Sequence, residues 1–450
     1  MNPYLESGLL LVSLLALPNN PASLWISQTS PQVPPEFQEL YSTLKSSLDN
    51  FNANLTLLNS KSNPPIFGAE LLPANSNRGD ALLAPNVMQS VTLYLDRLKE
   101  LGVGGVTFPV GYPLYTPSFL NYQNYVQFYK QVVQEIRKRG MIVDIESSVL
   151  FANSAFSAIT FDYSKLTFQQ FEMQRRQMIS AIIQDLQPDY LNLGAEPDTQ
   201  YMLTGYQEFR STQSYTAYVN YILDGLNRGK TKVGAGSGTW IDAQYVQSLA
   251  TNTNLDFIAL HVYPVVGPTL TRILTFADFA RQHGKRVILD EAWLSKIGTL
   301  QSMTIDANTD VFRNDAFSFW APLDQEFLST MVSAAKVAGI EYISPFWTMQ
   351  FFGYLDYTPV TATLSYRDIT AALNSVASKN LLSDQFSSTG LFYKQLTGSI
   401  PSSSTMPPTT QPTYTTTSFT NRPNGIGLGL IAELIVAAGI VAAGVLWRRR

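Results

Sequence analysis

The chain has 450 residues, and its 30 basic and 34 acidic side chains leave a formal net charge of −4. This balance gives no basic surface field, which argues against nucleic acid as a partner. The chain has no cysteine, so disulfides and thiolate metal sites are excluded. Its two histidines, His261 and His283, are too few for a metal site built on imidazoles, and we expect no metal or other cofactor.

The first 62 residues precede the regular part of the sequence. Residues 1–30 form a signal-like hydrophobic segment, because an apolar run at 8–17 has signal-peptide length and is followed by residues rich in Pro, Asn and Ser. A buried helix is the alternative, since no Lys or Arg precedes the run. Residues 31–62 show loose helical periodicity and are predicted to form an N-terminal helical extension.

Residues 63–398 alternate short apolar strands with amphipathic helices. The predicted strands cover residues 66–70, 105–109, 141–146, 190–196, 232–236, 257–263, 286–291 and 342–347. Eight strand-helix units over this length predict an α/β fold, a (β/α)8 TIM barrel. A doubly wound open sheet is the alternative, but it usually has fewer units and a Gly-rich first turn, which this sequence lacks.

The C-terminal residues have the composition of a membrane anchor. Residues 399–424 are rich in Ser, Thr and Pro and are predicted to form an extended stalk. Residues 425–447 are almost wholly apolar and long enough to span a bilayer, and residues 448–450 are three arginines. The positive-inside rule predicts a single-pass protein of the cell membrane, with the barrel outside and a cytoplasmic basic tail. The alternative, a core helix on the barrel, does not explain the stalk and the arginines.

Two glutamates end predicted strands on opposite sides of the barrel. Glu196 ends the fourth strand and Glu291 the seventh, and barrel enzymes carry their functional groups at these strand ends. Two carboxylates about 5 to 5.5 Å apart can cleave a glycosidic bond with retention of configuration. Strand alternation predicts that Asn192 faces the barrel interior and that Asp290 points to the helix layer, leaving Glu291 at the rim.

Four motifs at strand ends resemble those of the retaining glycoside hydrolase clan that has catalytic glutamates on strands four and seven of a (β/α)8 barrel. They are Gly-Ala-Glu-Pro at 194–197, His-Val-Tyr-Pro at 261–264, Asp-Glu-Ala-Trp at 290–293 and Phe-Trp at 346–347. The resemblance implies that Glu196 is the acid/base and Glu291 the nucleophile. It also implies that Tyr263 hydrogen-bonds the nucleophile, that Trp347 forms a sugar platform and that His261 lines the pocket.

The chain departs from this clan at two positions. Ala195 stands where most members carry an asparagine that binds the sugar 2-hydroxyl, and residues 105–109 lack the arginine that many members carry at the end of strand two. Without these two side chains the usual contact with the sugar 2-hydroxyl is in question, and with it the type of substrate or full activity.

Further strand-end residues are candidates for substrate binding. Glu70 and Glu146 end the first and third strands and are candidates for binding sugar hydroxyls, although a solvated or paired role is the alternative. Trp240 and Trp293 follow strands five and seven and could extend a sugar-binding cleft.

We therefore expect a cell-surface hydrolase of β-linked oligo- or polysaccharides. A non-catalytic glycan-binding protein on the same barrel is the second interpretation, supported by Ala195. An unrelated barrel enzyme is the third, and the absence of a Gly-rich phosphate loop argues against it. Composition and motifs do not reveal the sugar, the linkage or the oligomeric state.

Overall fold

A computed structural model describes residues 32–60, 64–300 and 305–398. The chain divides into two compact units, Met1–Gln32 and Val33–Arg450, and the fold below belongs to the second. The predicted signal-like segment, stalk, membrane-spanning segment and basic tail lie outside the described residues. Within those residues, no helix is both long and apolar enough to cross a bilayer.

Eight parallel strands form the centre of this unit, in the order β1-β8-β7-β6-β5-β4-β3-β2. Their bounds are β1 Ile66–Phe67, β2 Gly105–Pro109, β3 Ile142–Glu146, β4 Tyr190–Asn192, β5 Lys232–Gly238, β6 Phe257–Val262, β7 Arg286–Ala292 and β8 Tyr342–Pro345. The sheet closes between β1 and β2, because Gly104 N donates to Phe67 O (2.8 Å) and Thr107 N donates to Ala69 O (3.0 Å). The predicted (β/α)8 barrel is confirmed.

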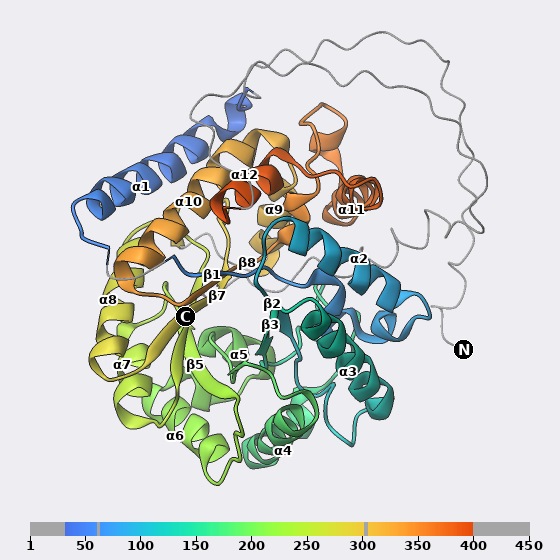
Figure 1. The fold of residues 1–450 in the computed structure, drawn as a ribbon, viewed down its shortest axis with the longest axis vertical. Helices are drawn as coiled ribbons and strands as arrows, with labels where there is room; N and C mark the ends of the chain where they lie inside the picture. The colour runs from blue at the N-terminus through green and yellow to red at the C-terminus, as the bar shows by residue number, and fades with distance from the viewer. Residues whose placement is uncertain (1–31, 61–63, 301–304, 399–450) are drawn as a thin grey trace. The chain divides into compact units, whose positions relative to one another are not determined.

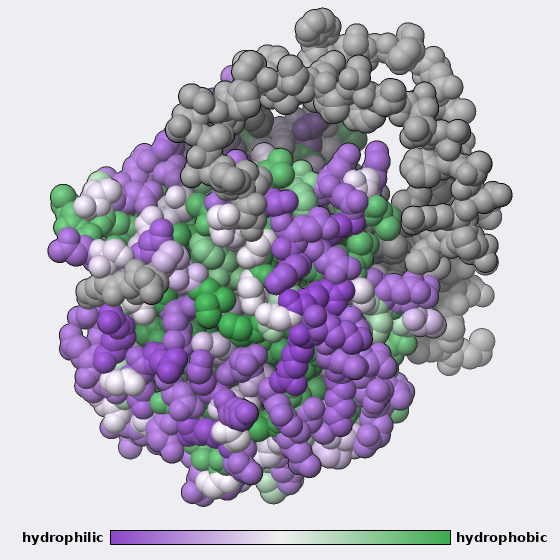
Figure 2. Space-filling view, viewed as in Figure 1, coloured by the Kyte–Doolittle hydropathy of each residue, from purple (hydrophilic) through white to green (hydrophobic). Residues whose placement is uncertain are grey.

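Helices surround the barrel in a ring (Figure 1). They are α1 Gln38–Thr56, α2 Val87–Glu100, α3 Tyr122–Lys138, α4 Phe168–Leu186, α5 Pro197–Thr204, α6 Thr212–Leu223, α7 Ala243–Asn252, α8 Thr269–Gln282, α9 Ile305–Asp315, α10 Ala321–Ala338, α11 Tyr366–Leu382 and α12 Ser388–Leu396. In the same orientation, hydrophilic side chains cover most of the outer helices, whereas hydrophobic residues gather near the centre of the ring (Figure 2). This pattern matches helices that bury one apolar face on a sheet.

Helix α1 lies on the outside of the ring against α10. Its buried side chains are Leu44, Leu48, Phe51 and Leu55, which recur at the three- and four-residue spacing of one helical face. The predicted N-terminal helical extension is thus a helix that joins the barrel's own hydrophobic core.

The lower barrel interior is filled by aromatic and small side chains. Tyr190 of β4 stacks on Tyr342 of β8 with ring centroids 6.0 Å apart, and Phe257 of β6 lies against Tyr190. Glycines on β5 make room for them: a Cβ on Gly234 would collide with the ring of Phe257, and one on Gly236 with the carbonyl of Ala259. The interior is therefore packed below the strand ends, as in other barrels of this type.

A buried lysine joins β7, α9 and α10. Lys296, just after β7, has a fully buried side chain whose ammonium contacts Asp315 Oδ1 (2.7 Å) and Asp324 Oδ1. Trp293 Nε1 donates to Asp315 Oδ2 (3.1 Å), and Tyr354 donates its hydroxyl proton to Asp324 Oδ2 (2.9 Å). Burial lowers the pKa of Lys296, but the two aspartates outweigh it and the pKa is raised, so the lysine is charged.

We expect Lys296→Ala to destabilise the protein strongly. Removing one partner of a buried ion pair leaves uncompensated carboxylates, which costs about 3–5 kcal/mol in the free energy of unfolding. Urea unfolding followed by circular dichroism measures this value. The exposed Lys230 provides a matched control, for which Lys230→Ala should change stability by less than about 0.5 kcal/mol. Equal effects of the two substitutions would show that the Lys296 cluster is not a stabilising contact.

Candidate active site

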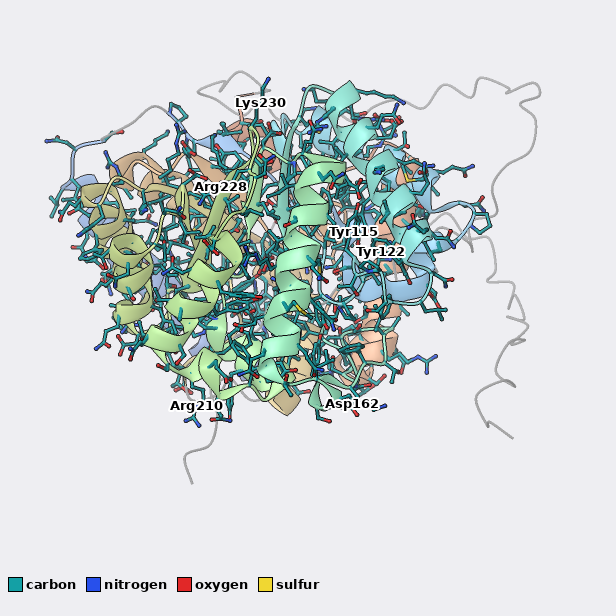
Figure 3. The ribbon with its side chains drawn as sticks, turned by 90° about the horizontal axis from the view of Figure 1, so that it is seen from below. Tyr115, Tyr122, Asp162, Arg210, Arg228 and Lys230 are labelled. Carbon is teal, nitrogen blue, oxygen red and sulfur yellow. The ribbon has the colours of Figure 1, made fainter. Side chains whose placement is uncertain are left out.

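The two ends of the barrel carry different groups of loops (Figure 3). Arg228 and Lys230, which precede β5, lie at one end. Asp162 and Arg210, from the segments that follow β3 and β4, lie at the other. The carboxyl ends of the strands, where barrel enzymes place their functional groups, therefore meet at the second end.

Glu196 lies at this end, at the junction of β4 and α5. It is the residue before α5, whose first residue is Pro197, and it is 8% exposed. Thr199, in the first turn of α5, donates its hydroxyl proton to Glu196 Oε2 (2.6 Å). The helix therefore fixes the direction of the Glu196 side chain. The sequence prediction omitted α5, although proline at its first position and Gly205 just after its end are the usual boundary residues of a helix.

Asp290, the neighbour of Glu291, faces the barrel interior, which corrects the prediction that it points to the helix layer. Asn192 Nδ2 of β4 donates to Asp290 Oδ2 (2.5 Å), so both side chains meet inside the barrel. The register of β7 against β8 shifts between Leu289 and Ala292, and this irregularity interrupts the alternation of sides on which the prediction relied. Consequently Asp290 faces the interior while Glu291 still reaches the residues at the strand ends.

His261, on β6, lies between the two glutamates. Its Nδ1 is 2.8 Å from Glu196 Oε1 and 3.2 Å from Glu291 Oε2. These two distances added together set an upper limit on the separation of the two carboxylate oxygens. This limit is of the order of the roughly 5 to 5.5 Å separation of a retaining pair. Tyr263, two residues along from His261, donates its hydroxyl proton to Glu291 Oε2 (2.6 Å). The structure thus brings together four predicted residues, which we call the centre: Glu196, Glu291, His261 and Tyr263.

The charges at this centre are strongly coupled. Burial lowers the pKa of His261, but Glu291, Asp290 and Glu196 outweigh it and hold this pKa well above its usual value. Burial and then Glu146 raise the pKa of Glu291, whereas the positive charge of His261 lowers it. Burial also raises the pKa of Glu146, which hydrogen-bonds with Glu291. Because two such neighbouring carboxyl groups resist ionising together, the charge of Glu146 disfavours the ionised form of Glu291.

One group of possible cation ligands occurs among the described residues. The nearest ligand atoms of Glu146, His261 and Glu291 lie within 4.8 Å of one another. Nδ1 of His261 is already within hydrogen-bond distance of Glu196, and Glu291 already accepts a hydrogen bond from Tyr263. In the part of the chain that the structure describes, these side chains therefore belong to a hydrogen-bonded cluster.

Glu70 and Trp347 lie on a neighbouring part of the rim. Asn75 Nδ2 donates to Glu70 Oε1 (3.2 Å), the backbone N–H of Trp347 also donates to Glu70, and burial raises the pKa of Glu70 to about 8. Trp347 has a left-handed backbone (φ 55°), a rare conformation for a bulky residue that is concentrated at functional sites. The ring of Phe312, on α9, is 4.5 Å from that of Trp347, so α9 covers the tryptophan.

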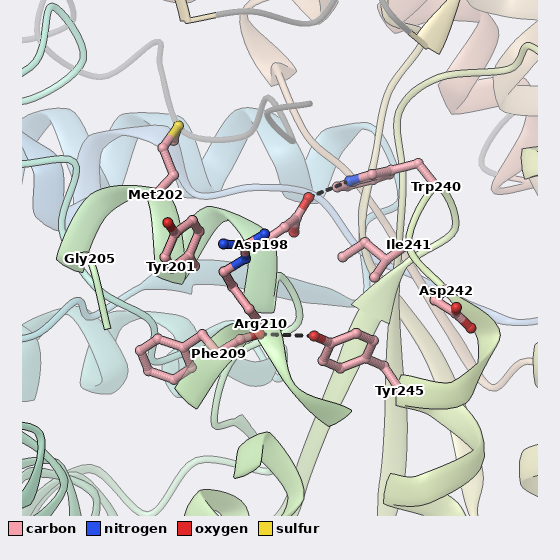
Figure 4. A pocket seen from close by; sticks show the side chains of 10 residues that line it. All are labelled: Asp198, Tyr201, Met202, Gly205, Phe209, Arg210, Trp240, Ile241, Asp242 and Tyr245. Atoms are coloured by element: carbon pink, nitrogen blue, oxygen red, sulfur yellow. Dashed lines mark hydrogen bonds between the residues drawn. The ribbon is translucent and has the colours of Figure 1, made fainter. Parts of the chain in front are cut away.

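The other two predicted tryptophans have different surroundings. Trp240 lies near the centre, with its ring 6.0 Å from that of Tyr263, and its Nε1 donates to Asp198 Oδ2 (2.9 Å). Trp293 is 2% exposed and packs into the Lys296 cluster, so it offers little surface to a ligand. Beside Trp240 a cavity of about 530 Å³ opens between α5 and the end of β5 (Figure 4). The two glutamates do not line this cavity, which adjoins them through Asp198 and Trp240.

The sequence analysis assigned no role at the site to the carboxyl groups of Asp144 and Asp290, which lie below the glutamates. Asp144 accepts a hydrogen bond from Thr107 (2.8 Å), and Asp290 accepts one from Asn192. Burial and then Asp290 raise the pKa of Asp144 well above its usual value. A carboxylate inside an apolar strand was visible in the sequence at both positions, and alternation along β3 alone would have placed Asp144 on the same face as Glu146.

Comparisons with solved structures include several distant similarities. No protein-family profile and no curated protein sequence matches the chain. Among solved structures, a GH5_18 protein from Bifidobacterium longum is 13% identical and aligns over 76% of this chain and 80% of its own, with a TM-score of 0.46. An exo-β-1,4-mannosidase from an Opitutaceae bacterium is 14% identical over 75% and 59% of the chains, with a TM-score of 0.45. The virulence factor SghA from Agrobacterium tumefaciens is 10% identical over 80% and 100%, with a TM-score of 0.44. The barrel assignment rests on the strand pairing of this chain itself.

Proposed function

We propose that this protein is a retaining glycoside hydrolase of β-linked glycans. The observation that carries the proposal is the placement of Glu196 and Glu291 on either side of His261 at the carboxyl end of a (β/α)8 barrel. Two carboxylates this close match the geometry for double displacement at an anomeric carbon. The burial of the centre also suits the chemistry, because shielding from water strengthens electrostatic interactions with a developing charge.

The proposed reaction has two steps. In the first, Glu291 attacks the anomeric carbon, the glycosidic C–O bond breaks, and Glu196 gives its proton to the leaving oxygen. In the second, Glu196 takes a proton from a water molecule, which attacks the same carbon and releases Glu291. Tyr263 holds Glu291 in position, and the charge of His261 favours the ionised Glu291 that the first step requires. Trp347, Glu70 and Glu146 are proposed to contact the sugar.

A screen with nitrophenyl β-glycosides and β-linked polysaccharides tests this function. Release of product by the native protein, and its loss in Glu291→Gln, is the expected result. The second candidate, a glycan-binding protein, is favoured by Ala195 and by the strongly raised pKa of Glu291, which disfavours its ionised form. Such a protein would bind glycans in calorimetry without any hydrolysis that depends on Glu291.

Glu146→Gln is expected to shift the pH dependence of this reaction. Glu291 must be ionised to attack, so activity falls as the pH drops through the pKa of Glu291. Glu146 raises that pKa, and removing its charge should lower it. We therefore expect the acidic limb of the kcat/KM profile to move to lower pH, even if the maximum falls. The exposed Glu39 supplies the control, since Glu39→Gln should leave the limb in place. An acidic limb that stays fixed or moves to higher pH in Glu146→Gln would contradict the coupling.

We also propose, from the sequence alone, that residues 425–447 anchor the protein in the cell membrane with the barrel outside. The stalk composition and the three terminal arginines support this proposal. Protease treatment of intact cells tests it, because a barrel that stays protected would overturn this orientation.

A further inference from the structure

The cavity of about 530 Å³ beside Trp240 is built from three segments of the barrel rim. Helix α5 contributes Asp198, Tyr201 and Met202, and the short helix Gln207–Arg210 contributes Phe209 and Arg210. The end of β5 and the start of α7 provide the opposite wall, which consists of Trp240, Ile241, Asp242 and Tyr245. Figure 4 shows these side chains converging on one space, whose size suits a small organic group.

Several polar groups of the lining are already engaged within the protein. Asp198 Oδ2 accepts from Trp240 Nε1 (2.9 Å), and Tyr245 donates its hydroxyl proton to Phe209 O (3.0 Å). The guanidinium of Arg210 lies over the ring of Tyr201, 5.0 Å from its centroid. Much of the remaining wall is apolar and includes Met202 and Ile241. A sugar would lose hydrogen bonds to water on entering such a space, whereas an apolar group would gain from burial.

The cavity adjoins the proposed active site on the side where Glu196 lies. Asp198 is two residues beyond Glu196, in the first turn of the same helix. Across the cavity, Trp240 contacts Tyr263, whose hydroxyl group binds Glu291. In the proposed reaction Glu196 must reach the leaving oxygen, so the part of the substrate on this side is the leaving group.

We propose that this cavity binds an apolar alkyl or aryl aglycone, and that the enzyme cleaves glycosides of hydrophobic alcohols. The proposal rests on the proposed glycosidase function and assigns it a substrate class. Met202, Ile241 and Trp240 provide the apolar contacts.

Alkyl glycosides test this assignment, because methyl and hexyl β-glucosides or β-galactosides differ in apolar surface but hardly in the reactivity of the leaving oxygen. Each buried methylene contributes about 0.8 kcal/mol, so even partial burial of the chain should make kcat/KM for the hexyl glycoside at least about tenfold higher than for the methyl glycoside. Met202→Ser and Ile241→Ser should each lower this hexyl-to-methyl ratio several-fold. Met173 on α4, which is 45% exposed, supplies the control, and Met173→Ser should leave the ratio unchanged.

Calorimetry with Glu291→Gln adds a measurement that needs no turnover, and hexyl glycoside should bind at least about tenfold more tightly than methyl glycoside. Equal kcat/KM values, or equal affinities, for the two glycosides would overturn the assignment while leaving the glycosidase proposal intact. A preference for a β-linked disaccharide over the hexyl glycoside that is lost in Ile241→Ser would also overturn it, because the cavity would then hold a second sugar. Tighter binding of the hexyl glycoside without any hydrolysis would support the cavity and contradict the proposed catalysis.

Discussion

Glu291→Gln is expected to lower kcat/KM for every substrate by about 10⁴-fold or more, because a covalent nucleophile cannot be replaced by a neutral amide and such losses reach 10⁴ to 10⁶ in other enzymes. Activated aryl glycosides should be no exception, since their better leaving group does not supply the missing nucleophile. The substitution removes one charge from a cluster rich in carboxyl groups, so we expect the folded protein to be at least as stable as the native one. Steady-state kinetics and thermal unfolding measure the two effects.

Two comparisons make this result specific. Glu341 lies directly before β8, at the opposite end of the barrel, where it pairs with Arg286, so Glu341→Gln should keep nearly full activity. Azide added to Glu291→Ala should restore cleavage of an activated substrate and give a glycosyl azide of inverted configuration, because the azide attacks from the side that the nucleophile occupied. Activity of Glu291→Gln within tenfold of the native value would assign the nucleophile to another residue.

Glu196→Gln is expected to have an effect that depends on the leaving group. Proton transfer to a leaving oxygen contributes about 10²- to 10⁴-fold, so alkyl glycosides and natural glycans should lose activity in that range. Nitrophenolate leaves without a proton, so the glycosylation step with nitrophenyl glycosides should be much less affected. A burst of nitrophenol followed by slow turnover should appear, because the second step still needs a base to activate water.

A second substitution at Glu196 distinguishes the roles of the two glutamates. Azide should accelerate Glu196→Ala by attacking the glycosyl-enzyme, and the glycosyl azide should then have retained configuration. Thr199→Val offers a milder change, since it removes one hydrogen bond to Glu196 and leaves the contact with His261, and it should reduce activity less than Glu196→Gln. Equal losses for alkyl and nitrophenyl glycosides in the first step would show that Glu196 is not the proton donor.

The sequence predicted the barrel because its strands and helices differ clearly in period and length. Alternation correctly placed Asn192 inside, where it binds Asp290. The same rule failed for Asp290, because a register shift in β7 depends on the pairing of neighbouring strands and leaves no local mark in the sequence. The role of Trp293 was equally hidden, since its partner Asp315 lies 22 residues away.

The composition of the candidate site was predicted better than its electrostatics. Motifs at strand ends identified Glu196, Glu291, His261 and Tyr263, because barrel topology brings such ends together. The coupling between Glu146 and Glu291 could not be foreseen, because it depends on burial and on distances of a few ångströms between three strands. The cavity beside Trp240 also depends on α5, an eight-residue helix that the hydrophobic pattern does not reveal.

The anomeric configuration of the first-formed product tests the central claim most directly. Proton NMR during the first minutes of hydrolysis of a β-glycoside, before the released sugar mutarotates, distinguishes the two anomers. Double displacement by Glu291 and Glu196 predicts that the β-anomer appears first. Initial appearance of the α-anomer would mean that water attacks directly, and it would contradict the nucleophilic role proposed for Glu291.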